Sequence, residues 1–142
     1  MRKRSLAREI ALQALYQLEV RGNEAEIDVI NLCQARTNHP EIQEFARDLI
    51  KSVQEKQTEL DNNISKMLDN WNLNRLAILD RIILRMATYE MMYCDDIPPI
   101  VAINEAVDLA KKYSTKESGS FVNGILDKIY QAQTKTHLNK FE

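Results

Sequence analysis

The chain has 142 residues, of which 44% are hydrophobic and 28% charged, and this balance is typical of a single soluble globular domain. It contains only three glycines and three prolines, which favours long helices over many short strands. The net charge of −2 by itself argues against a nucleic-acid partner, and no apolar run approaches the roughly 18 residues that a membrane span needs.

The first predicted helix is amphipathic. In SLAREIALQALYQLEV, residues 5–20, apolar side chains recur every four residues, which is the spacing of one helix face. Ser5 is a suitable N-cap and Gly22 a suitable C-terminal stop. We therefore predict a helix of about four turns between these two residues.

Three more helices are predicted before residue 70. The one in EAEIDVINLCQAR, residues 24–36, has along one side Ile27, Ile30 and Cys33 or Gln34. A third helix follows Pro40, and its apolar positions are Ile42, Phe45, Leu49 and Val53. The polar run QEKQTELD then allows a bend, and Thr58 with Asp61 resembles a capping box that starts a fourth helix.

The second half of the chain contains the most apolar segment, residues 74–93, which we expect to be the central helix with Asn74 as its cap. DDIPPI must be a loop because two prolines disfavour helix there. Helices are predicted over 101–113 and 120–133, with STKESG between them as a short loop or first turn, and residues 135–142 as a frayed tail. The prediction is an all-α fold of about seven helices in one compact domain.

The charges are unevenly distributed along the chain. Residues 1–8 carry a net charge of +4, residues 9–110 carry −9, and residues 111–142 carry +3. If the two ends meet in space, the fold has a basic face on an acidic body. Such a face can bind an anion although the overall charge does not indicate it.

We find no pattern that indicates catalysis or a bound metal. The two cysteines, Cys33 and Cys94, form no C-x-x-C pair and resemble reduced core thiols, and the two histidines lie in polar contexts, so no zinc site is expected. There is no phosphate-binding glycine loop and no paired nucleophile and base. The basic N-terminus lacks the apolar stretch of a secretory signal. We expect a cytoplasmic protein that is not an enzyme and has no cofactor.

Three segments of the second half resemble a known family. LDRIILRMATYEM, IPPIVAINEAVDLAKKY and SGSFVNGILDKI, in this order, are similar to the NusB family of bacterial transcription antitermination factors, and the opening RSLAREIALQALYQLE also matches. The resemblance covers about residues 4–130. It implies an all-helical fold of two small three-helix bundles packed at an angle.

The resemblance also implies a function. Members of the family bind boxA, a short single-stranded element of nascent ribosomal RNA, together with NusE, which is also a protein of the small ribosomal subunit. The complex joins other Nus factors on RNA polymerase and suppresses early termination. Some members form homodimers that cover the RNA-binding face.

The resemblance assigns roles to individual residues. The family's RNA surface corresponds here to Arg2, Lys3, Arg4, Arg8, Tyr16, Lys116, Gly119, Ser120, Phe121 and Asn123. The NusE contact corresponds to the central-helix residues Asp80 and Arg81. We expect Arg85 and Glu90 to belong instead to an internal ion-pair network that braces the two bundles, with Glu105 as a candidate partner. Both surfaces are predictions from the family pattern.

Each of these residues also has a structural interpretation. Phe121 is either a platform on which a base stacks or a core residue in line with Ile125 and Ile129. Tyr16 can be a half-buried core edge, Asn123 can brace the neighbouring loop, and a basic N-terminus is often a solvated tail. We interpret Gly124 as a packing glycine that lets two helices touch.

Two other classes of function compete with an RNA-binding module. One is a helical protein–protein adaptor whose basic ends are incidental. A measurement of salt-dependent RNA binding distinguishes this adaptor from an RNA-binding module. The other is a domain of a ribosomal-RNA methyltransferase that acts in trans, because the same module occurs in such enzymes. The lack of a cofactor loop argues against the enzyme.

Overall fold

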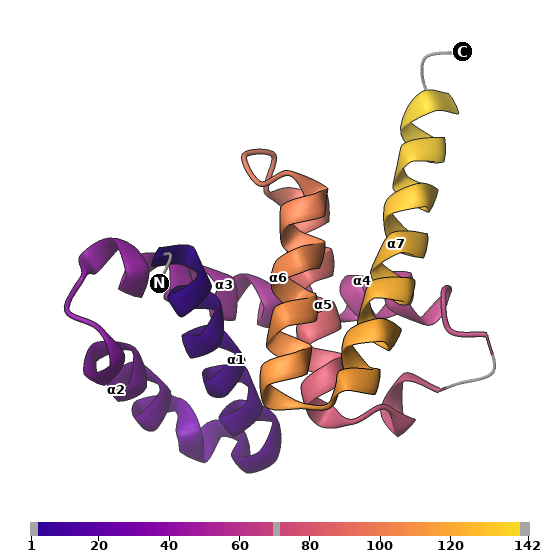
Figure 1. Cartoon of the computed structure of the whole chain (residues 1–142). Coiled ribbons are helices and arrows are strands. Elements are labelled where there is room, and N and C mark those ends of the chain that lie inside the picture. Colours follow the sequence, from indigo (N-terminus) through magenta and orange to yellow (C-terminus); the bar gives the residue numbers. More distant parts are fainter. Residues whose placement is uncertain (1–2, 70–71, 140–142) are drawn as a thin grey trace. The chain divides into compact units, whose positions relative to one another are not determined.

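The computed structural model of the chain is all-helical throughout the residues that it describes, 3–69 and 72–139, with side chains described as far as residue 134 (Figure 1). Within these residues there are seven α-helices and two short 3-10 helices. The all-α prediction is confirmed. None of the described helices has the length and apolar character that crossing a membrane requires.

The chain divides into two compact units, residues 1–55 and 56–142, and each is described here by itself. The first unit contains three α-helices and one 3-10 helix: α1 (Lys3–Arg21), η1 (Gly22–Ala25), α2 (Glu26–Arg36) and α3 (Pro40–Glu55). The second unit contains four α-helices and one 3-10 helix: α4 (Gln57–Ser65), η2 (Leu73–Arg75), α5 (Ile78–Tyr93), α6 (Pro99–Tyr113) and α7 (Lys116–Asn139). The resemblance implied three helices in each bundle, so the second unit has one α-helix more.

Helix α1 begins earlier than predicted. It starts at Lys3, so Ser5 lies inside the first turns and is not the N-cap. The predicted stop is confirmed, because Gly22 follows the last residue of α1 with a φ of 67°, a left-handed conformation that glycine adopts without steric cost.

The buried side of α2 differs from the predicted one. Ile27 and Ile30 are 73% and 55% exposed, whereas Val29 and Cys33 are buried. Apolar residues lie on more than one side of this short helix, and its own periodicity does not decide which side is buried. Packing within the unit buries the side that carries Val29 and Cys33.

Helix boundaries in the second unit also differ from the predicted caps. Helix α4 begins at Gln57, so Thr58 lies within its first turn, and the proposed capping box with Asp61 is not made. Asn74 lies in η2 rather than at the start of the central helix, which begins at Ile78. The backbone N–H of Asn74 donates instead to Oδ1 of Asn72, 2.9 Å away.

The last two helices start where local chemistry favours a start. Pro99 is the first residue of α6, where the missing N–H of proline has no cost. Helix α7 is preceded by Thr115, whose Oγ1 accepts the backbone N–H of Ser118 at 3.0 Å and so serves as the N-cap. The segment STKESG is therefore a cap and first turn. Helix α7 continues to Asn139, through part of the segment that was predicted to be a frayed tail.

The core of the second unit is centred on α5, as predicted for the most apolar helix. The fully buried side chains of this helix include Ile82, Ile83, Leu84 and Met86. A charged residue also reaches the core, because Arg85 is 5% exposed and donates to both carboxylate oxygens of Asp61, at 2.7 and 3.0 Å. The structural role expected for Arg85 is confirmed. Its partner Asp61 is on α4 of the same unit, so this ion pair does not join the two bundles as predicted.

Candidate functional site

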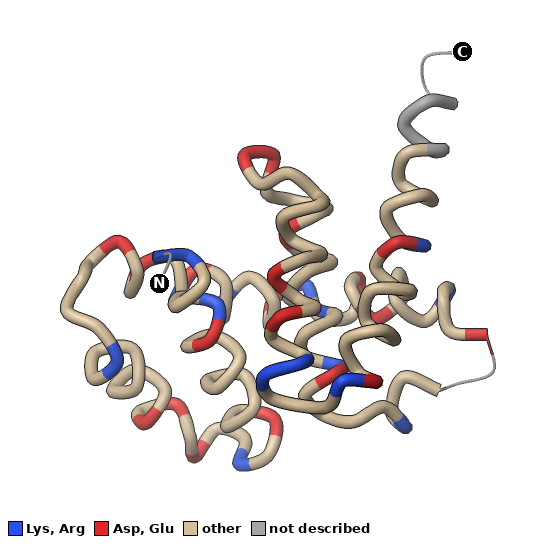
Figure 2. The backbone as a smooth tube through the Cα atoms, viewed as in Figure 1, with Lys and Arg blue, Asp and Glu red and all other residues tan. Residues whose placement is uncertain are grey.

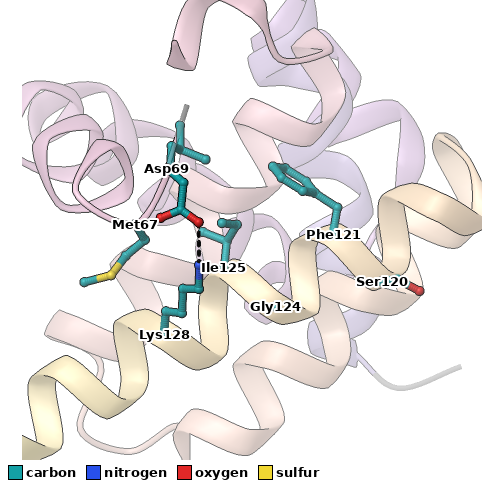
Figure 3. A pocket seen from close by; sticks show the side chains of 8 residues that line it. Met67, Asp69, Ser120, Phe121, Gly124, Ile125 and Lys128 are labelled. Carbon is teal, nitrogen blue, oxygen red and sulfur yellow. Dashed lines mark ion pairs between the residues drawn. The ribbon is translucent and has the colours of Figure 1, made fainter. Parts of the chain in front are cut away.

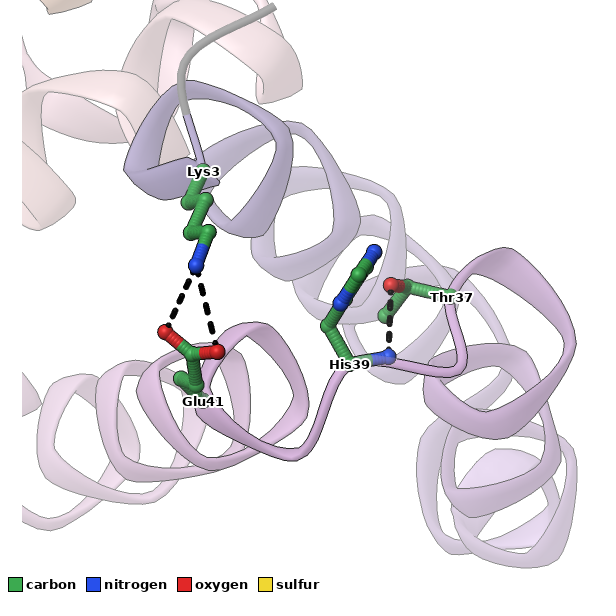
Figure 4. A network of polar contacts seen from close by, with 4 residues as sticks. All are labelled: Lys3, Thr37, His39 and Glu41. Atoms are coloured by element: carbon green, nitrogen blue, oxygen red, sulfur yellow. Dashed lines mark hydrogen bonds and ion pairs between the residues drawn. The ribbon is translucent and has the colours of Figure 1, made fainter.

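Figure 2 shows basic residues at the start of α1. Their side chains contact other residues of the first unit. The Nζ of Lys3 forms an ion pair with Oε2 of Glu41 at 3.0 Å, on the first turn of α3 (Figure 4). The guanidinium groups of Arg4 and Arg8 lie over the ring of Phe45, 4.9 and 5.5 Å from its centroid. Arg2 lies outside the described residues. The sequence reasoning did not identify Glu41 and Phe45 as partners of this cluster.

This cluster combines its side-chain charges with the helix dipole. The first turn of α1 contains no acidic residue, and the helix dipole adds positive potential there. Placing cations at a helix N-terminus is unfavourable, and the Glu41 carboxylate and the Phe45 ring offset part of that cost. Lys3 and Arg4 remain exposed, so the net result is an accessible site of positive potential.

Two other predicted residues of this unit differ in accessibility. Arg8 is only 3% exposed, and its guanidinium packs against the ring of Phe45. Tyr16 is 37% exposed, which places it at the surface of α1. Both remain predictions as RNA contacts, and the structure makes Tyr16 the more accessible of the two.

The turn that leads into α3 is held by Thr37, whose carbonyl oxygen accepts the side-chain amide of Gln43 at 2.7 Å. Its Oγ1 accepts the backbone N–H of His39 at 3.1 Å (Figure 4). These bonds fix the start of α3 and therefore the position of Glu41 opposite Lys3.

In the second unit, a buried polar network ties the start of α7 to α5. The hydroxyl of Ser118 donates to Oδ2 of Asp80 at 3.0 Å, and the hydroxyls of Ser114 and Thr115 lie 2.9 and 3.0 Å from the same Ser118 oxygen. Asp80 and Arg81 are each 8% exposed. Of the two predicted partner residues, Asp80 therefore has an evident structural role, which is to anchor the first turn of α7.

The two glycines of α7 have different surroundings. A Cβ on Gly119 would lie 2.9 Å from Cγ of Lys111, so this glycine leaves room for the aliphatic stem of that lysine. A Cβ on Gly124 would meet no atom within 4 Å. The interpretation of Gly124 as a glycine that lets two helices touch is wrong, whereas at Gly119 the missing side chain makes room for Lys111.

Exposed cations surround the start of α7. Lys111 and Lys112 lie in the last turn of α6, and Lys116 is the first residue of α7 (Figure 2). Because the aliphatic stem of Lys111 lies against Gly119, its ammonium group is held beside the first turn of α7. Of the predicted residues in this region, Ser120 and Asn123 are exposed and Phe121 is half-buried.

A cavity of about 450 Å³ lies along α7 next to Phe121. Its wall on α7 is formed by Phe121, Gly124, Ile125 and Lys128, and residues that follow α4, including Met67 and Asp69, close the other side (Figure 3). The Nζ of Lys128 pairs with Oδ2 of Asp69 at 3.6 Å at one end of the cavity. Phe121 is thus a wall of an open cavity and not a fully buried core residue.

A separate aromatic cluster lies at the end of α5. The rings of Tyr89 and Tyr93 stack with centroids 5.4 Å apart, and Nζ of Lys56 lies 4.3 Å from the centroid of Tyr93. A hydrogen bond to Glu59, with burial, raises the pKa of Tyr93 to about 12. Within residues 3–69 and the described residues from 72 onward, no group of histidine, cysteine and carboxylate side chains is arranged to hold a metal.

These features define a class of protein, an all-helical chain of two compact units. The first unit has basic residues at the start of α1. The second has basic residues around the start of α7, next to a cavity. The chain belongs to the NusB family, whose model matches residues 5–131, so the resemblance described above is confirmed.

Similar proteins and structures cover almost the whole chain. The transcription antitermination protein NusB of Geobacillus kaustophilus is 47% identical over 94% of this chain and 99% of its own length. The transcription antitermination protein NusB of Acetivibrio thermocellus is 44% identical over 92% of this chain and 90% of its own length. A crystal structure of the antitermination factors NusB and NusE in complex with dsRNA has 31% identity, covers 93% of this chain and 98% of that one, and has a TM-score of 0.82. NusB of T. maritima has 38% identity, covers 92% of each chain and has a TM-score of 0.80.

Proposed function

We propose that this protein is a cytoplasmic transcription antitermination factor that binds boxA-type RNA of the ribosomal RNA leader together with NusE, and through other Nus factors acts on RNA polymerase. The observation that carries the proposal is membership of the NusB family, with a relative solved in complex with NusE and RNA. The protein acts by binding and is not an enzyme. The family implies a single-stranded element, whereas the solved relative is in complex with dsRNA.

The first unit contributes a phosphate-binding surface at the start of α1. Lys3 and Arg4 are exposed there, and the helix dipole adds to their positive potential. Arg8 supports this surface by packing against Phe45. Arg2 belongs to the same proposed surface by its place in the sequence.

The second unit contributes a base-binding surface at the start of α7. Phe121 offers a half-exposed ring for stacking, and Lys116, Ser120 and Asn123 are exposed on the same helix. Gly119 contributes indirectly, because it allows Lys111 to lie beside the first turn.

The NusE contact is proposed at Asp80 and Arg81. Since both side chains are about nine-tenths buried, only a small part of each is open to a partner. Asp80→Asn is therefore the suitable test variant, because it keeps the shape of the side chain. We expect weaker NusE binding with an intact fold, and unchanged NusE binding would restrict Asp80 to its structural role.

The deciding experiment measures RNA affinity against salt concentration, with and without NusE, for single-stranded and double-stranded boxA-type RNA. Each phosphate contact that is lost lowers the salt slope by about 0.7 for a single strand. Neutralising Arg2, Lys3 and Arg4 together should flatten the slope and leave the helical content intact. Lys51→Gln is the matched control, because Lys51 is an exposed cation of α3 that pairs only weakly with Glu55, at 4.0 Å.

One observation favours the alternative of a protein–protein adaptor without RNA binding. The contacts of Lys3 with Glu41 and of Arg4 with Phe45 give this basic cluster structural partners within its own unit. A salt slope that is unchanged by the triple neutralisation would support the adaptor and contradict the proposed RNA surface.

A further inference from the structure

Helix α2 exposes two isoleucines that the first unit does not bury. Val29 and Cys33 of this helix are buried, whereas Ile27 and Ile30 are 73% and 55% exposed. Because positions 27 and 30 are three residues apart, their side chains are neighbours on one helix face. Single exposed apolar residues are normal on a protein surface, but two adjacent ones on a short helix form an apolar patch.

Helix stability does not account for isoleucine at these two positions. Isoleucine is β-branched and loses side-chain freedom in a helix, so a straight-chain polar residue such as glutamine favours the helix more strongly. The neighbouring exposed positions of α2, Asn31 and Gln34, carry such polar side chains. A partner that covers Ile27 and Ile30 would account for their exposure.

Acidic residues surround the two isoleucines. Residues 19–35 carry four carboxylates and one arginine, a net charge of −3. Glu26 and Asp28 flank Ile27 in the chain and, at about 100° per residue, lie on either side of it around the helix. Glu24 precedes them in η1, and Figure 2 shows acidic residues along η1 and the first turn of α2. The apolar pair therefore has a negatively charged rim.

We propose that Ile27, Ile30 and their acidic rim, the α2 patch, form a docking surface for a basic protein segment. The segment carries apolar anchor side chains between lysines and arginines. Its anchors cover the two isoleucines, and its cations face Glu24 and Glu26. This partner is additional to RNA and NusE, whose proposed contacts lie at the starts of α1 and α7 and on α5.

The charge of the α2 patch disfavours the other possible occupants. The net charge of −3 over residues 19–35 repels the phosphates of RNA and the anionic surface of a membrane. A second copy that paired through the same patch would place these carboxylates against their own equivalents, because an isologous contact joins identical surfaces. A basic protein segment offers both the opposite charge and apolar side chains.

The test measures binding of a model segment to the full chain by fluorescence anisotropy. The probe is a labelled peptide of about 18 residues, or five helical turns, with leucine on one face and lysine on the other. Its affinity for the Ile27→Gln/Ile30→Gln variant should fall about 10- to 150-fold, the loss of burying about one isoleucine side chain. The melting temperature should stay close to that of the wild type, because both side chains are largely exposed and glutamine favours the helix.

Two controls check that the surface and its charge are specific. Ile100→Gln, at a 62% exposed isoleucine of α6, should bind the lysine peptide as the wild type does. A matched peptide with glutamate in place of lysine should bind much more weakly, and added salt should weaken binding of the lysine peptide. Glu24→Gln/Glu26→Gln should lower the affinity for the lysine peptide and reduce its salt dependence.

Equal peptide affinities of the wild type and Ile27→Gln/Ile30→Gln, or an equal loss in Ile100→Gln, would overturn the proposal. So would a wild-type dimer that Ile27→Gln/Ile30→Gln converts to monomer in sedimentation, since the occupant would then be a second copy. Loss of NusE or RNA binding in this variant would assign the patch to those partners and overturn an additional one. A wild-type chain that binds the peptide at this patch and binds no RNA would support the patch and contradict the proposed function.

Discussion

Replacing Phe121 with alanine distinguishes its two possible roles, a platform on which an RNA base stacks and a residue of the hydrophobic core. A fully buried phenylalanine that is cut to alanine costs about 3–5 kcal/mol of folding stability. Phe121 is half-buried and already borders an open cavity, so its removal enlarges a solvent-accessible space and does not create a closed one. Taking about half of the 1.5–3 kcal/mol for burying the ring, we expect a loss of about 1 kcal/mol. RNA affinity should fall by roughly 1–3 kcal/mol.

Both quantities are measured on the same protein, by urea unfolding and by fluorescence anisotropy with labelled RNA. Leu126→Ala is the matched control, because Leu126 is fully buried on the same helix. That variant should lose about 2–5 kcal/mol of stability, while the folded fraction binds RNA normally. A Phe121→Ala variant that loses more than about 3 kcal/mol of stability and retains wild-type affinity would refute the stacking role.

Three further predictions concern stability and reactivity. Asp61→Asn should lower the free energy of unfolding by about 3 kcal/mol, because it removes a charged partner that contacts the buried guanidinium of Arg85. Arg85→Met should cost less, because Asp61 is partly open to water. Urea unfolding that ranks the two variants the other way would contradict this. Because the pKa of Tyr93 is raised, the folded state keeps the phenolic proton to a higher pH than the unfolded state does. The contribution of this protonated group to folding stability is complete below pH 10 and is lost as the pH rises towards about 12. Tyr93→Phe should remove this part of the alkaline decline, which denaturation across that pH range would measure. Burial raises the pKa of the Cys33 thiol. In the folded protein, a thiol reagent should therefore modify Cys94 first and reach Cys33 only on unfolding. Equal rates of modification at the two cysteines would argue against the burial of Cys33.

Much of the helical framework follows from local chemistry that the sequence displays. Gly22 ends α1 because its left-handed φ suits glycine. Pro98 lies just before α6 and Pro99 is its first residue, so the last two residues of the predicted loop DDIPPI are helical. The predicted caps at Ser5 and Asn74 failed because each residue lies within a helical turn of the structure. A capping residue is recognised by its type, but the turn at which a helix begins also depends on packing around it.

The candidate site was only partly predictable. The sequence indicated the basic segments and Phe121, and the family pattern added their proposed role. It did not indicate that Phe45 lies under the arginines of α1 or that Asp69 lies across a cavity from α7, because these contacts join residues far apart in the chain. It also assigned a packing role to Gly124, where a Cβ would meet no atom within 4 Å.

What the sequence by itself determined is therefore the helical character of the chain, several of its breaks and its family, since helical periodicity, glycine and proline act over a few residues. Tertiary structure alone decided which side of α2 is buried, which glycine is needed for packing and which acid pairs with Arg85, 24 residues from Asp61. The physical reason is that a helix repeats its pattern on every face, whereas burial, close approach and charge pairing depend on the neighbour that a distant part of the chain supplies.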